Sequence, residues 1–283
     1  MSVMLTIPTT TEVSNAEPGI EIGGAVFAFR AWGVGIELRV PDALLALLPS
    51  PIVPGAVADY SGLADAVLSV QVNPAVEGAP HYEVFEDGTL LARETSLQSA
   101  ACMVESRVQL TVAALAKGPI FVHAGVVGWR DKAIVIPGRS FSGKSTLVMA
   151  FAEAGADYYS DEYALFDADG KIHPYWRQPK LRSASGRIVA GRLRNNIILE
   201  GPPPAPISLG WVLMSRYEAK SSWQPRRLTC GETMLGLLDN TVPIRSRPEE
   251  SVRRLAKAVV NAQGFEGPRG EAADMARQIL ALL

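Results

Sequence analysis

The chain has 283 residues, of which 48% are hydrophobic, and 27 basic residues nearly balance 29 acidic residues to give a net charge of -2. A chain of this length and composition can bury a large core in one or two domains. The balanced charge argues against a dedicated nucleic-acid-binding protein, which normally carries a basic surplus. Two cysteines cannot form a disulfide framework, and the most apolar stretch, residues 43–58, is interrupted by prolines and too short to span a membrane.

The first part of the sequence predicts a tail and a small β-rich module. Residues 1–21 are polar and lack periodicity, and they have neither the basic region nor the apolar run of a signal peptide. We therefore expect a loose tail and a cytoplasmic protein. Residues 22–94 contain short runs of alternating apolar and polar side chains, typical of strands. Residues 86–88 predict a hairpin turn, and Asp42 can cap a short helix over residues 43–48.

The remainder, residues 95–283, is predicted to form a second domain that begins and ends with helices. Thr95 and Gln98 have the spacing of a capping box, and Gly118-Pro119 would end the first helix at Lys117. We place the domain boundary at the start of this helix. Further helices are predicted from the capping box Thr229 with Glu232 to Asp239, from Ser246 with Glu249 to Gln263, and over residues 272–283.

The clearest chemical motif lies between residues 134 and 155. Gly138, followed after four residues by Gly143-Lys144-Ser145, matches the phosphate-loop pattern, with an apolar run before it and an amphipathic helix after it. In such a loop, backbone N–H groups surround the phosphates, the lysine reaches the β- and γ-phosphates, and the serine hydroxyl binds Mg²⁺. The alternative is a Gly/Ser-rich turn that fits by chance. The residues predicted to contact the nucleotide are Gly138, Arg139, Ser140, Phe141, Ser142, Gly143, Lys144, Ser145 and Thr146.

The strand before the loop is predicted to belong to a hairpin. Residues 120–127 and 133–137 are both apolar runs, and the short polar segment between them can join only antiparallel strands. The sheet around the phosphate loop should therefore be mixed. This arrangement argues against an ATPase of the cassette or AAA type, in which the loop strand lies among parallel strands.

Two acidic residues and several basic residues follow the loop. Residues 158–166 are predicted to form one strand that contains Asp161 and Glu162, either of which can bind Mg²⁺ or act as a catalytic base. Adjacent strand residues point to opposite faces, so the two acids should not share one role unless the strand ends or bulges there. Asp161 can also be a salt-bridged structural acid. Arg177, Lys180 and Arg182 can either meet a phosphate or form a solvated edge, and Arg182 is our candidate.

These motifs together resemble the catalytic domain of HPr kinase/phosphorylase, in the diverged form encoded beside peptide-modification genes. The resemblance rests on HAGVV from His123, GRSFSGKST at the loop and YYSDEYALFD from Tyr158. It implies an α/β P-loop domain of the HPr kinase/phosphoenolpyruvate carboxykinase type with a mixed sheet, and ATP and Mg²⁺ as cofactors. It also implies roles for His123 beside the loop, for Ser145 and Asp161 at the metal, and for Asp161 or Glu162 as proton acceptor. The second acid is Glu where the family has Asp, and the family's later glutamate signature has no counterpart.

The sequence therefore predicts an ATP-dependent kinase that transfers the γ-phosphoryl group to a hydroxyl, most simply a serine of a peptide or small protein. The alternative is a nucleotide-binding regulatory module without phosphoryl transfer. His123 is either a site residue or a core histidine, since one histidine on a strand is a weak signal by itself. We expect neither a nucleic acid nor a membrane as partner, and the family resemblance implies a homo-oligomer.

Overall fold

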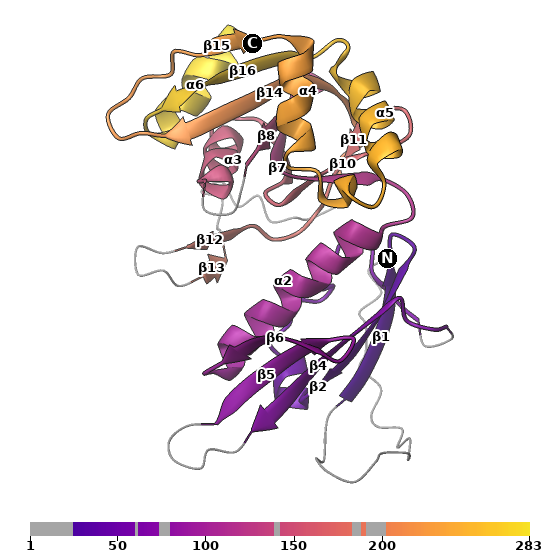
Figure 1. The fold of residues 1–283 in the computed structure, drawn as a ribbon. Helices are drawn as coiled ribbons and strands as arrows, with labels where there is room; N and C mark the ends of the chain where they lie inside the picture. Colours follow the sequence, from indigo (N-terminus) through magenta and orange to yellow (C-terminus); the bar gives the residue numbers. More distant parts are fainter. Residues whose placement is uncertain (1–24, 60–61, 74–79, 139–141, 183–187, 191–201) are drawn as a thin grey trace. The chain divides into compact units, whose positions relative to one another are not determined.

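The computed structural model describes residues 25–59, 62–73, 80–138, 142–182, 188–190 and 202–283. The chain divides into two compact units, Met1–Lys117 and Gly118–Leu283, each built on a mixed sheet (Figure 1). The expected tail at residues 1–21 lies outside the described residues. The sequence predicts a boundary before helix α2 (Leu97–Leu115), but the division falls after it. The reason is that this helix packs against strands of the first unit.

The first unit is a six-stranded sheet with the order β3-β1-β2-β4-β5-β6. Strands β2 and β4 pair in parallel and the other pairs are antiparallel, and the predicted hairpin forms β5 and β6. Val104, Val108 and Val112 form the buried face of α2, which lies against the sheet (Figure 1). The bounds are β1 Ala25–Ala31, β2 Val34–Val40, α1 Asp42–Leu45, β3 Val57–Ala58, β4 Ala66–Asn73, β5 His81–Glu86 and β6 Thr89–Glu94.

Two helix starts in this unit differ from the prediction by one residue. Helix α2 is capped by Ser96, whose hydroxyl accepts a hydrogen bond from the Ser99 backbone N–H at 3.1 Å, so Thr95 is not the cap. Asp42 lies inside α1, which follows Pro41 and has no side-chain cap. Ser96 can cap α2 because its hydroxyl is the same kind of acceptor as that of Thr95. Pro41 can precede α1 because its ring fixes the backbone angle φ.

The second unit is an eight-stranded sheet with the order β11-β10-β7-β8-β14-β16-β15, in which β9 also pairs with β7. Strand β8 pairs antiparallel with β7 and parallel with β14, so the sheet is mixed, as the hairpin predicts. The bounds of its strands are β7 Ile120–Trp129, β8 Lys132–Pro137, β9 Asp157–Ser160, β10 Tyr163–Phe166, β11 Lys171–His173, β14 Ile207–Tyr217, β15 Arg226–Leu228 and β16 Gln263–Arg269; β12 Lys180–Arg182 and β13 Ile188–Ala190 pair separately.

Helices cover both faces of this sheet. Ile134 and Ile136 of β8 pack in one buried cluster with helices α3 (Lys144–Glu153) and α6 (Ala272–Leu282). Val135 points the other way, as alternation along a strand requires, into a second cluster with α4 (Cys230–Leu238) and α5 (Pro248–Val259). In the described part of the chain, no helix combines the length and the apolar character that a membrane span needs.

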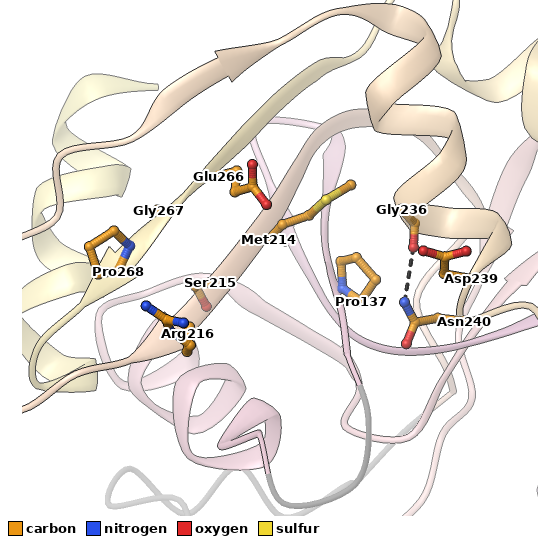
Figure 2. A pocket seen from close by; sticks show the side chains of 10 residues that line it. All are labelled: Pro137, Met214, Ser215, Arg216, Gly236, Asp239, Asn240, Glu266, Gly267 and Pro268. Atoms are coloured by element: carbon orange, nitrogen blue, oxygen red, sulfur yellow. Dashed lines mark hydrogen bonds between the residues drawn. The ribbon is translucent and has the colours of Figure 1, made fainter.

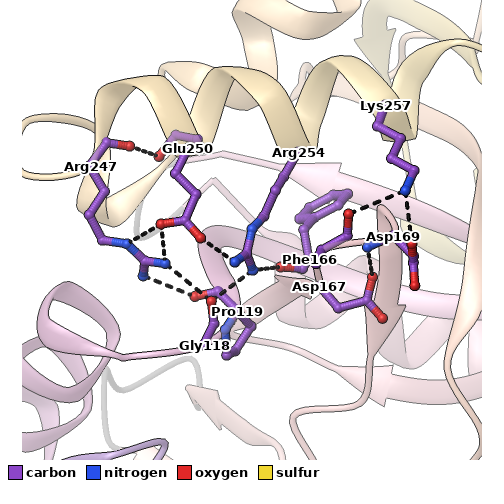
Figure 3. Close-up of polar contacts among 11 residues, drawn as sticks. Gly118, Pro119, Phe166, Asp167, Asp169, Arg247, Glu250, Arg254 and Lys257 are labelled. Carbon is purple, nitrogen blue, oxygen red and sulfur yellow. Dashed lines mark hydrogen bonds and ion pairs between the residues drawn. The ribbon is translucent and has the colours of Figure 1, made fainter.

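Hydrogen bonds from arginine side chains to backbone oxygens hold α5 at the start of β7 and the end of β10 (Figure 3). Arg254 donates to the backbone oxygens of Gly118 at 2.7 Å and of Phe166 at 3.3 Å, and it pairs with Glu250. Arg247 pairs with the same carboxylate at 2.6 Å. Burial alone would raise the pKa of Glu250, but the bonds to the two arginines lower it. Strands β7 and β10 are thus bonded to a helix as well as to each other.

Three predictions for the second unit differ from the structure. Residues 158–166 form two strands, β9 and β10, with a break at Asp161 and Glu162. Helix α5 begins at Pro248 after Arg247, so Ser246 is not its cap, and it ends at Val259. Residues 263–269, where that helix was expected to end, form strand β16 in the middle of the sheet. The capping box at Thr229 and Glu232 is confirmed.

Candidate active site

The phosphate-loop sequence connects the end of β8 to the start of α3, as its motif requires. Gly143 precedes the helix with a φ of 82°, a conformation that favours glycine. A Cβ atom there would lie 2.5 Å from Nη2 of Arg269, and one at Gly138 would lie 2.9 Å from the Ser142 hydroxyl. A side chain at either glycine would therefore have to displace the Arg269 guanidinium or the Ser142 hydroxyl. Arg139, Ser140 and Phe141 lie outside the described residues.

Lys144 is the first residue of α3 and is buried, with 7% of its surface exposed. Burial lowers the pKa of Lys144, and the charges of Glu162 and Asp161 act against that shift. Ser145 is half-buried and Thr146 is exposed in the same first helical turn. Since the N-terminal turn of a helix offers free backbone N–H groups, the loop presents a cation and several donors at one place.

The break between β9 and β10 places the two acids at the edge of β7. The Ser160 hydroxyl accepts hydrogen bonds from the backbone N–H groups of Glu162 at 3.1 Å and Tyr163 at 3.0 Å, which turns the chain out of the strand. The Glu162 carbonyl accepts a bond from the Ala124 N–H of β7 at 3.1 Å. Because strand β9 ends at Ser160, the side chains of both acids can face one partner. The sequence analysis allowed a shared role only if the strand ended or bulged at this point.

That shared partner is Arg177. Its Nε lies 3.5 Å from Oδ1 of Asp161, and its Nη2 lies 3.4 Å from Oε2 of Glu162. Burial would lower the pKa of Arg177, but the charges of Asp161 and Glu162 raise it instead. Arg177 therefore stays positively charged between two carboxylates.

Asp161 is the more enclosed acid, with only 1% of its side chain exposed. Its Oδ1 lies 3.2 Å from the hydroxyl of Tyr158, which is also 3.0 Å from the backbone oxygen of Arg177. Burial, followed by the nearby charge of Asp161, raises the pKa of Tyr158 well above its ordinary value. The tyrosine is thus a neutral hydroxyl that can donate to the carboxylate.

Glu162 is the more accessible acid, with 30% of its side chain exposed. Its Oε1 lies 3.5 Å from Nε2 of His123, on β7. Burial alone would raise the pKa of Glu162, but the bond to His123 and the charges of Arg177 and Lys144 lower it. The structure therefore brings together four predicted site residues, since Lys144, Asp161, Glu162 and His123 surround one corner.

Arg182 ends strand β12, which pairs with β13 as a separate two-stranded sheet. Its side chain lies outside what the structure describes, so its role at the site stays a prediction. The guanidinium beside the acids belongs to Arg177, which the sequence marked as a basic residue near the strands without selecting it.

Arg269, at the end of β16, is a site residue that the sequence analysis missed. It is 3% exposed, and its Nη2 donates to the backbone oxygen of Gly143 at 3.3 Å. Its Nε is buried and has no hydrogen-bond partner among the described residues. Burial lowers the pKa of Arg269. The signal that could have found it is an arginine at the end of a strand, but residues 263–269 did not read as a strand.

The expected cofactors find a partial fit in this geometry. Lys144, Arg269 and the first turn of α3 suit a polyphosphate, and the unpartnered Nε of Arg269 leaves a donor for an anion. Ser145 offers a hydroxyl to Mg²⁺, whereas Asp161 is engaged by Tyr158 and Arg177. Within the described ranges, no group of three or more His, Cys, Asp or Glu residues is arranged to hold a metal ion. Mg²⁺ would therefore depend on the nucleotide for most of its ligands.

No family model matches the sequence, and no curated protein matches it. A solved structure described as the Hpr(Ser) kinase/phosphatase from Coxiella burnetii is similar to this chain, with 12% sequence identity and a TM-score of 0.34. The match covers 57% of this chain and 92% of that one. At this level of likeness, neither a shared family nor a shared activity follows.

Proposed function

We propose that the second unit is an ATP-dependent kinase that transfers the γ-phosphoryl group to a hydroxyl, in the simplest case a serine of a peptide or small protein. The observation that carries this proposal is the buried ammonium of Lys144 at a helix N-terminus, where it feels the charges of Asp161 and Glu162. A cation for the phosphates and a base for the hydroxyl are the two groups that phosphoryl transfer requires close together.

Glu162 is the base in this proposal. Its side chain is accessible, and its lowered pKa keeps it ionised at neutral pH, whereas Asp161 is enclosed by Tyr158 and Arg177. The acceptor hydroxyl gives its proton to Glu162 as its oxygen bonds to the γ-phosphorus. The bond from that phosphorus to the β,γ-bridging oxygen breaks, and ADP leaves with the electron pair. Since the transition state is loose, positioning and charge compensation supply most of the acceleration.

The other residues hold this arrangement. His123 keeps Glu162 in place through the 3.5 Å contact, and Asp161 orients Arg177, whose positive charge can meet the transferring group. Lys144 and Arg269 would meet the β- and γ-phosphates at the loop. Ser145 would hold Mg²⁺, which, when bound with ATP, neutralises charge on the β- and γ-phosphates.

The test uses ATP labelled in its γ-phosphate and degenerate peptide pools, one with a fixed serine and one with alanine at the same position. We expect label in the serine pool with the wild-type protein and none with Lys144→Ala. Lys171→Ala, an exposed lysine on β11, is the matched control and should label like the wild type. If the wild-type protein binds ATP but labels no serine pool, the nucleotide-binding regulatory module would be favoured instead.

A further inference from the structure

A pocket of about 480 Å³ opens beside the phosphate loop (Figure 2). It is formed by the ends of strands β8, β14 and β16 and by the end of helix α4. This volume lies in the range of small-molecule sites, and clefts at the carboxyl ends of parallel strands are the usual ligand positions in open α/β sheets. The acidic corner described above shares none of the pocket's lining residues.

The pocket is continuous with the loop through the chain itself. Pro137 lines the pocket and precedes the first motif glycine, Gly138. Pro268 lines it from β16 and precedes Arg269, whose guanidinium donates to the Gly143 oxygen at 3.3 Å. A ligand held by the loop therefore lies next to the pocket on two sides.

We propose that this pocket binds the ribose and base of the nucleotide, an inference that rests on the proposed function. The acids lie along β7, and most of the pocket lies beyond β8, between β14, β16 and α4; the two adjoin at Asn240, whose backbone oxygen accepts a hydrogen bond from the His123 N–H at 2.7 Å. The γ-phosphoryl group must face the acids to react. The rest of the nucleotide then leaves the loop toward the pocket.

The acceptors and apolar surface of the pocket walls suit a nucleoside. The carboxylate of Asp239 has no ion pair or side-chain hydrogen bond among the described residues, so it can accept bonds from a ligand. The side-chain N–H of Asn240 donates to the Gly236 oxygen at 2.9 Å, which leaves the Asn240 amide oxygen as a second acceptor. Ribose hydroxyls and the amino group of a base are donors that fit these acceptors. Met214 and the two prolines supply apolar surface for the base.

The test separates the nucleoside from the phosphates by calorimetry with two probes, magnesium ATP and magnesium tripolyphosphate. We expect Asp239→Ala to weaken ATP binding about tenfold, the effect of losing a hydrogen bond to a charged group, and to leave tripolyphosphate binding unchanged. Asp169→Ala removes an exposed carboxylate in the turn between β10 and β11, and this control should change neither affinity.

A second variant narrows the pocket without removing a polar group. A methyl group at Gly236 would meet the Sδ and Cε atoms of Met214, so the thioether of Met214 must move within the pocket wall. Alanine suits the interior of helix α4 better than glycine, so Gly236→Ala should fold. It should also weaken ATP binding and spare tripolyphosphate.

Three results would overturn the assignment. Equal losses for ATP and tripolyphosphate would show that the pocket acts on the loop as a whole. Unchanged ATP affinity in both variants together with slower serine labelling would assign the pocket to the acceptor. If the wild-type protein binds neither probe, the proposed function itself fails and the nucleoside assignment falls with it.

Discussion

The two sides of strand β8 differ in how their polar groups are satisfied. On the β7 side, Arg177 contacts both Asp161 and Glu162, and Glu162 also contacts His123, so each carboxylate already has a polar partner. On the β14 side, the Asp239 carboxylate faces a pocket and has no side-chain partner among the described residues. Groups that must hold their geometry while charge moves benefit from fixed partners, whereas groups that recognise a ligand must leave their partners to that ligand.

The largest effect is expected at Arg177, the cation that both acids on the β7 side share. Replacing it with leucine leaves two carboxylates without their cation, one of them almost fully buried, and breaking a buried ion pair costs about 3–5 kcal/mol. We expect Arg177→Leu to lower the local unfolding free energy of β9 and β10 by a loss of that order. Hydrogen exchange measured by mass spectrometry reports this quantity, segment by segment, in a two-unit chain.

Two further variants sharpen that test. Asp161→Asn combined with Arg177→Leu should recover part of the loss, because the buried charge is removed with its partner. Arg216→Leu removes an arginine that is 82% exposed and pairs only weakly with Glu218 at 3.5 Å, so it should leave exchange unchanged. Equal exchange in Arg177→Leu and Arg216→Leu would mean that Arg177 does not stabilise the acid corner.

Gly143 lies where the two sides meet, and its replacement should have an intermediate effect. Alanine there must adopt a φ of 82° and approach the Arg269 guanidinium, and the backbone conformation alone costs roughly 1–2 kcal/mol. We expect Gly143→Ala to weaken magnesium tripolyphosphate binding by about tenfold or more in calorimetry. Gly155→Ala is the matched control, because Gly155 has a φ of 103° but nothing within 4 Å. A similar loss in that variant would point to backbone strain in α3 and not to Arg269.

The smallest effect concerns pH and Glu162. Its pKa is lowered from the ordinary 4.5 in the folded protein, so its contribution to stability is present above that value and is lost as the pH falls through the folded pKa. We expect the local stability of β10 to decline in acid in the wild type and to decline less in Glu162→Gln. Hydrogen exchange corrected for the intrinsic pH dependence measures it, with Glu153→Gln, an exposed residue at the end of α3, as the charge control. An identical acid profile in Glu162→Gln and wild type would contradict the pairing with His123 and Arg177.

The elements on the β7 side could be predicted from the sequence because they lie close together along the chain. The hairpin of β7 and β8, the loop, helix α3 and the acid pair lie within about fifty residues, and turn residues, capping patterns and a spacing motif identify each. The break at Asp161 and Glu162 was anticipated only as an exception. No local pattern distinguishes a strand that ends at Ser160 from one that continues.

The pocket side could not be reached in the same way. Strand β16 contains two glycines and a proline, which depress strand propensity, and Gly264 after a helical pattern reads as a helix end. Its place between β14 and β15 is set by tertiary pairing alone. Arg177 lies outside any helix or strand, so only the folded chain brings it to the acids. Because β16 was not predicted, neither Arg269 at its end nor the pocket that it lines could be predicted.

The number of residues between β9 and β10 determines how β10 pairs with β7. Ser160 pairs with Val126 and Tyr163 pairs with His123, so the two acids stand opposite two residues of β7 with no residue inserted. Deleting one residue there would slide β10 by one position along β7 and turn its side chains to the other face. Tyr163 and Leu165 would exchange faces with Ala164 and Phe166, and because all four are buried, the packing on both faces would change. Homologous sequences that keep the two acids should therefore also keep the count of residues around them, so alignment gaps belong outside Ser160–Phe166.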